Sequence, residues 1–101
     1  MEDARTYAWI LYALEGASQT GPAKLSGISK VADGINHAVP THKEMQSSLK
    51  WLMENGWVQK DGSGFQLTEK GVGAVSSARE GNTTIFQVWA ALTSALSACL
   101  G

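Results

Sequence analysis

The sequence contains little cysteine, little proline and no low-complexity stretch. Cys99 is the only cysteine, so an internal disulfide is excluded. The two prolines and the scattered glycines mark no linker, and no segment repeats at a fixed period. With 101 residues, 44% of them hydrophobic, the chain can build one core but is too short for two ordinary domains. We therefore predict a single domain over residues 1–101.

A dominant charge of either sign is also missing. The formal net charge is −1 at pH 7, whereas strong sequence-independent binding of nucleic acid normally requires a basic surface. Residues 24–70 contain six lysines and five acidic residues, a local excess that permits DNA binding without indicating it. The first residues show no basic stretch leading into an apolar segment and a cleavage site, so we expect a cytoplasmic protein.

Signatures of catalysis and of metal binding are lacking as well. No Gly-x-Ser-x-Gly elbow, phosphate loop or dinucleotide fingerprint occurs in the sequence. His37 and His42 are the only histidines, and Asp33 lies one turn before His37, but a metal site would need further partners. Cys99 is expected to pack as a small hydrophobe. We therefore predict no enzyme, no metal and no cofactor.

Apolar periodicity predicts that the chain opens with a helix over residues 3–15, with Asp3 as its N-cap. One side of this helix carries the apolar positions that we place in the core: Tyr7, Ile10, Leu11 and Leu14. Trp9 and Tyr12 lie on the opposite side, where a helix at a monomer surface carries mostly polar groups. These two aromatic residues therefore suggest a second contact surface.

A short second helix is predicted over residues 26–35. The clearest helix-start signal in the sequence follows it and marks a third helix. Thr41 can cap the free amides while the side chain of Glu44 reaches back to it. Asn55-Gly56 supplies the end of this helix. The inward positions are Met45, Leu49 and Leu52, and the outward positions are Lys43, Gln46, Ser47 and Lys50.

A hairpin and two further helices complete the predicted fold. Residues 57–60 and 65–68 are two short strands joined by a loop over residues 61–64. Thr68 caps the fourth helix, and Thr83 or Thr84 starts the last one. The apolar stripe of the last helix is Ile85, Val88, Trp89, Leu92, Leu96, Cys99 and Leu100. The fold class is therefore mainly α with a small β-hairpin (α+β).

The segment from Gly81 to Gly101 has no charged side chain, which raises the question of a membrane anchor. Its usable length is too short, and polar residues interrupt it, so we expect no membrane span. Small residues form a face opposite the apolar stripe of its helix: Gln87, Ala91, Ser94 and Ala98. Such a helix cannot hide both faces on a domain this small, which favours a homodimer over a helix folded back on its own core.

Two motifs in this order resemble those of winged helix-turn-helix regulators of the MarR and PadR kind. They are Glu54-Asn55-Gly56-Trp57-Val58 at the end of the third helix and Leu67-Thr68-Glu69-Lys70-Gly71 after the hairpin. The resemblance covers residues 24–71. It implies that the third helix enters the major groove of double-stranded DNA, that the hairpin is the wing, and that the outer helices, including residues 83–101, build a homodimer.

The resemblance and the outward helix face together predict a DNA-binding transcriptional regulator. Its DNA-contacting residues would be Lys24, Lys30, Thr41, His42, Lys43, Gln46, Ser47, Lys50 and Lys60. Its dimer interface would contain Trp9, Tyr12, Ile85, Trp89, Leu92 and Leu96. The alternative is a winged-helix protein-interaction module that binds through Trp9, Tyr12, Trp51 and Trp89. A third option is a small-molecule effector bound between the dimer helices.

Overall fold

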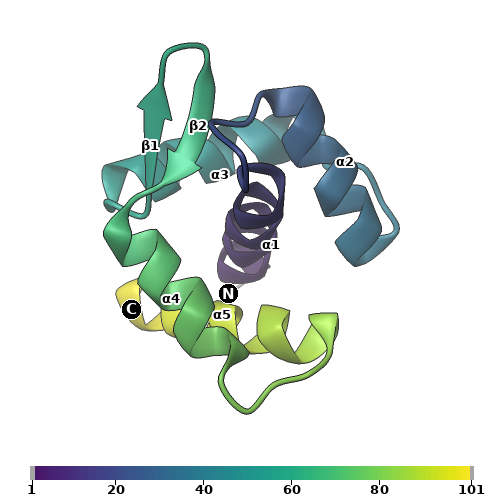
Figure 1. Cartoon of the computed structure of the whole chain (residues 1–101). Coiled ribbons are helices and arrows are strands. Elements are labelled where there is room, and N and C mark those ends of the chain that lie inside the picture. Colours follow the sequence, from purple (N-terminus) through teal and green to yellow (C-terminus); the bar gives the residue numbers. More distant parts are fainter. Residues whose placement is uncertain (1, 101) are drawn as a thin grey trace.

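The computed structural model describes residues 2–100 and arranges five helices and one hairpin around a central helix (Figure 1). The elements, in chain order, are α1 (Glu2–Ala17), α2 (Leu25–Asn36), α3 (His42–Glu54), β1 (Val58–Asp61), β2 (Gly64–Leu67), α4 (Glu69–Arg79) and α5 (Ile85–Leu100). The predicted class, mainly α with a small antiparallel hairpin, is confirmed. The helix starts differ slightly, because α1 begins at Glu2 and Asp3 lies in its first turn rather than capping it.

The central helix α1 has buried residues on opposite sides, which contradicts the expectation that Trp9 faces outward. Its buried residues are Ala4, Ala8, Trp9, Ile10, Leu11, Ala13 and Leu14. Trp9 is only 4% exposed, and its indole Nε1 donates a hydrogen bond to the carbonyl of Ala32 in α2 at 2.9 Å. Tyr12 is partly buried against the core. The prediction failed because α1 has packing partners on both sides, so Trp9 is covered by the chain's own helices.

The third helix begins and ends where the local signals predict. Thr41 and Glu44 form the capping box, with both reciprocal hydrogen bonds present. Gly56 follows the helix with a φ of 78°, a left-handed conformation in which glycine has no side-chain clash. The buried underside consists of Met45, Ser48, Leu49 and Leu52. These contacts hold α3 against the core as a rigid rod.

The hairpin is tied to the rest of the domain by a contact that the sequence did not reveal. Its strands pair in register from Val58–Leu67 to Asp61–Gly64. Ala23, in the loop before α2, forms an antiparallel bridge with Phe65, with two backbone hydrogen bonds of 2.8 Å. The loop between α1 and α2 therefore holds the hairpin beside the start of α2, as Figure 1 shows.

The junction between α3 and α4 is closed by the residues of the two motifs. The Thr68 hydroxyl donates to the Gly56 carbonyl at 2.6 Å and accepts from the Gly71 amide at 3.2 Å. The Lys70 ammonium donates to the Asn55 carbonyl at 2.9 Å and lies 4.3 Å from the centroid of the Trp57 ring. The motifs therefore join the end of one helix to the start of the next.

The last helix folds back on its own chain. Val88, Trp89, Leu92 and Leu96 are buried, and the Trp89 indole donates to the Arg5 carbonyl at 2.9 Å. Trp89, Leu92 and Leu96, which we expected in a dimer interface, are instead covered by α1 and α4 of the same chain. Cys99 is exposed rather than packed. Within residues 2–100, no helix combines the length and apolar character needed to cross a bilayer.

We predict that Gly71→Ala destabilises the domain whereas Gly73→Ala does not. A Cβ at Gly71 would lie 2.2 Å from the Trp57 carbonyl oxygen, so α4 would have to move away from the hairpin. The expected loss is about 2 kcal/mol in the free energy of unfolding, measured by urea denaturation. A Cβ at Gly73 meets nothing within 4 Å, so this control should gain about 0.5–1 kcal/mol from helix propensity. Equal stability of the two variants would contradict the prediction.

Candidate nucleic-acid interface

The outer face of α3 is exposed to solvent. All four predicted outward residues, Lys43, Gln46, Ser47 and Lys50, are exposed. Their spacing of three, one and three places them along one side of the helix. The last helix, α5, packs on α1 and α4, and the first helix, α1, contacts α3 but leaves these four residues exposed. The structure therefore presents a polar, lysine-bearing helix face to solvent.

The N-terminal end of α3 contributes Thr41 and His42, which are also exposed. The Thr41 hydroxyl accepts a hydrogen bond from the Glu44 amide at 3.0 Å, and the Thr41 amide donates to the Glu44 carboxylate at 2.8 Å. The side chains of Thr41 and Glu44 therefore fix the start of α3. Thr41 positions the exposed face, and its hydroxyl retains its proton for one further hydrogen bond.

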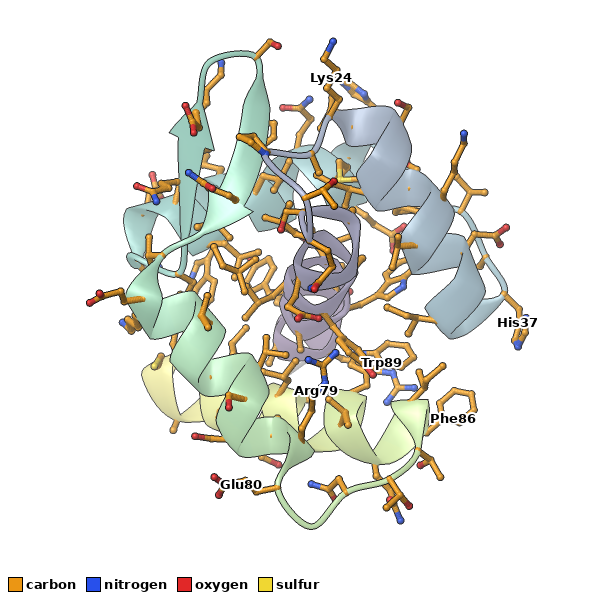
Figure 2. All side chains as sticks on the ribbon, in the orientation of Figure 1. Lys24, His37, Arg79, Glu80, Phe86 and Trp89 are labelled. Carbon is orange, nitrogen blue, oxygen red and sulfur yellow. The ribbon has the colours of Figure 1, made fainter. Side chains whose placement is uncertain are left out.

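The other predicted lysines lie on the elements beside α3. Lys24 is the N-cap residue of α2, Lys30 is exposed on α2, and Lys60 is exposed on β1. Figure 2 shows the Lys24 side chain pointing away from the domain at the start of α2. Because Ala23 and Lys60 both pair with Phe65, Lys24 and Lys60 lie on segments about 10 Å apart, two strand spacings. The strand β2 lies between these two basic positions.

Acidic groups balance much of this positive charge. Glu54 is exposed at the end of α3, and Asp61 is exposed at the end of β1, where it accepts a hydrogen bond from Gln66 at 3.0 Å. Asp33 is exposed on α2 together with Lys30. Like charges repel phosphate, so these carboxylates limit the attraction that the five lysines exert on DNA. The surface around α3 therefore carries only a small excess of positive charge.

An aromatic pair lies beside this face. The rings of Tyr7 on α1 and Trp51 on α3 stack with centroids 4.6 Å apart and an interplanar angle of 12°. Both residues are half-buried, so the stack braces α3 against α1. Burial raises the pKa of the Tyr7 phenol, and the negative charges of Asp3 and Glu54 raise it further.

The two histidines lie at helix ends, His37 at the end of α2 and His42 at the start of α3. His37 ends α2 in a left-handed conformation, and its amide donates to the Asp33 carbonyl at 2.7 Å. No group of three or more His, Cys, Asp or Glu side chains suited to a metal is found in the described part of the chain.

Of the predicted dimer residues, Trp9, Trp89, Leu92 and Leu96 are buried within the chain, Tyr12 is partly buried, and Ile85 is 46% exposed.

Sequence reasoning missed Phe86 as a surface residue. It is 59% exposed and its ring stacks 6.4 Å from that of Trp89. In Figure 2 Phe86 points outward from the start of α5, whereas Trp89 points toward the core. The absence of Phe86 from the apolar stripe of the helix was the one signal that placed it outside.

We predict that the stability of the domain falls above pH 10 and that Tyr7→Phe reduces this fall. The pKa of Tyr7 is raised in the folded state from its ordinary value of 10.0. The unfolded chain therefore loses the phenol proton first, and the stability that Tyr7 contributes is lost as pH rises from 10.0 through the folded-state pKa. Urea denaturation at a series of pH values measures it. The Tyr12→Phe variant keeps Tyr7 and should retain the full decrease.

Comparison with known proteins leaves the surface geometry as the basis for a functional conclusion. Neither a protein-family model, nor a curated protein, nor a solved structure matches this chain. The exposed face of α3 and the charges around it are therefore the features that bear on function.

Proposed function

We propose that the chain is a DNA-binding transcriptional regulator that inserts α3 into the major groove. The observation that carries this proposal is the exposed side of α3, on which Lys43, Gln46, Ser47 and Lys50 follow one another at helical spacing. A major groove admits one α-helix, and residues along one side of that helix reach successive base edges. The buried underside and the capping box keep this helix in a fixed position.

The chemistry of these side chains suits base and phosphate recognition. An amide such as that of Gln46 can pair with both N6 and N7 of adenine, and a lysine can bind guanine or a phosphate. Lys24 and Lys60 lie on segments on either side of β2 and would contact the DNA backbone beside the groove. In this arrangement the hairpin acts as a wing, in keeping with the resemblance to MarR and PadR regulators.

The near-neutral charge is compatible with this function if two copies of the chain bind together. A net charge of −1 gives one copy little electrostatic attraction to DNA. Two α3 helices placed one turn of DNA apart would double the number of contacts. The proposed interface is the outer side of α5, where Gln87, Ser94 and Ala98 are exposed and Ala91 is partly exposed. These side chains are small or uncharged, so two α5 helices can approach closely without like-charge repulsion.

A protein-interaction module is the second candidate. The aromatic residues first assigned to such a surface do not support it, since Trp9 and Trp89 are buried and Trp51 stacks on Tyr7. The exposed Ile85 and Phe86 favour it instead, because neighbouring large apolar side chains on a surface often mark a contact with another protein. Retention on heparin separates the two: a DNA binder elutes at raised salt, and a neutral module flows through.

We predict that Lys43→Ala combined with Lys50→Ala weakens DNA binding by at least about tenfold and lowers the salt dependence by about one per lost phosphate contact. The DNA is a duplex selected from a random-sequence library by the wild-type chain, and binding is measured by fluorescence anisotropy. Failure of the wild-type chain to enrich any duplex would overturn the proposal.

The matched control for this variant is Ser76→Glu combined with Ser77→Glu. Both serines are exposed on α4, away from α3, and the change lowers the net charge by the same amount as the loss of two lysines. The control should bind DNA nearly as well as wild type, because general repulsion at that distance is screened by salt. Equal loss in both variants would show that total charge, and not the face of α3, governs binding.

We also predict that wild type sediments as a dimer at high micromolar concentration and that Ser94→Glu converts it to a monomer. A glutamate on the outer side of α5 would lie close to its symmetry mate and would bury a charge in the interface. Ser94 is exposed, so the folding of one chain should be unaffected. Ser76→Glu on α4 is the control and should stay dimeric. A monomeric wild type would refute the proposed interface.

A further inference from the structure

The exposed face of α3 carries polar groups of three chemical kinds. Lys43 and Lys50 carry ammonium groups, Ser47 carries a hydroxyl, and Gln46 carries a carboxamide. Because an α-helix rises about 1.5 Å per residue, Gln46 lies about 4.5 Å after Lys43 and about 6 Å before Lys50 along the helix axis. The carboxamide therefore lies between two ammonium groups, with one lysine about a turn away on each side.

The carboxamide of Gln46 has no hydrogen-bond partner among the described residues, unlike that of most other glutamines in the chain. Gln19 and Gln66 donate to carboxylates at 2.9 and 3.0 Å. The side-chain oxygen of Gln87 accepts two backbone amides at the start of α5. The exposed Gln59 on β1 shares the unpaired state of Gln46. Both the donor and the acceptor of Gln46 are thus available to another molecule.

These three kinds of side chain differ in how sharply they distinguish one base pair from another. A lysine only donates, so it binds the acceptors of guanine and the phosphate oxygens, which occur in every sequence. A serine hydroxyl donates and accepts through one atom, and it pairs with several bases. A carboxamide presents a donor and an acceptor side by side, which matches N7 and N6 of adenine in the major groove. Gln46 is therefore the residue of this face that can select one base.

We infer that Gln46 is the specificity-determining residue of α3 and that it reads an adenine in the major groove. This inference rests on the proposed function and names the base that the same face recognises. The Nε2 group of Gln46 donates to adenine N7, and its Oε1 atom accepts from the N6 amino group. The flanking lysines supply electrostatic attraction, and the carboxamide between them supplies the choice of base.

The backbone that carries Gln46 is held in place on its buried side. Met45 precedes it and Leu49 follows within one turn, and both are buried in the core. Trp51, further along α3, stacks on Tyr7 of α1 with ring centroids 4.6 Å apart. A pair of hydrogen bonds to one base edge requires such a fixed support, because a displacement of about 1 Å weakens both bonds. On binding, Gln46 therefore has only its own side chain to order.

The experiment selects duplexes from one random-sequence library with wild type, Gln46→Ala and Gln46→Glu in parallel. Gln46→Ala removes both hydrogen-bonding atoms and should lose the preference at one base pair, where wild type selects adenine. Gln46→Glu can only accept, so it should select cytosine there, because the N4 amino group of cytosine donates. Fluorescence anisotropy then compares four duplexes that differ only at this pair. Wild type should bind the adenine duplex about tenfold more tightly than the others, and Gln46→Ala should bind all four nearly equally.

Gln59→Ala is the matched control, because it removes an equally exposed and unpaired carboxamide from β1 instead of α3. It should select the same base as wild type, and circular dichroism should show all variants folded, since both glutamines are exposed. The inference is overturned if Gln46→Ala keeps every preference of wild type, if the lost preference is for a base other than adenine, or if Gln59→Ala loses it too. DNA binding itself would survive each of these outcomes, whereas enrichment of no duplex by wild type would refute the proposed function and the inference together.

Discussion

The burial of α1 between helices on opposite sides is the constraint on which the rest of the structure depends. Trp9 of α1 donates to the Ala32 carbonyl of α2, and Trp89 of α5 donates to the Arg5 carbonyl of α1. These two indoles tie elements far apart in the sequence to the same helix. As a result, α2 and α3 cover one part of α1 and α5 covers another (Figure 1). The inner face of α3 packs against α1, and its outer face is left exposed.

Local signals in the sequence were sufficient to define the helix ends that present this face. Thr41 and Glu44 act within one helical turn, and Thr68 bonds an amide three residues away. Gly56 follows the end of α3 with a positive φ, which depends on this residue alone. Such interactions depend on near neighbours in the chain, so a pattern of residue types is enough to detect them. The exposed positions of α3 follow from the same periodicity once its ends are known.

Long-range packing was the part that could not be predicted. Periodicity finds one apolar side of a helix, and it assigned Trp9 to the other side of α1. The small residues Ala4, Ala8 and Ala13 are fully buried, because alanine lets a second layer of helices approach closely. Their presence in a helix with few polar residues was the available signal. The Ala23–Phe65 bridge had no signal, since it joins residues more than forty positions apart.

The residues of the two motifs that resemble those of a known family make contacts that hold the fold together. Thr68 and Gly71 join the start of α4 to Gly56, and Lys70 binds the Asn55 carbonyl and lies over Trp57. None of these side chains belongs to the exposed face of α3. A resemblance carried by such residues therefore concerns the architecture more than the ligand. Lys43, Gln46, Ser47 and Lys50, on which the proposed function rests, are exposed on α3 and take no part in this junction.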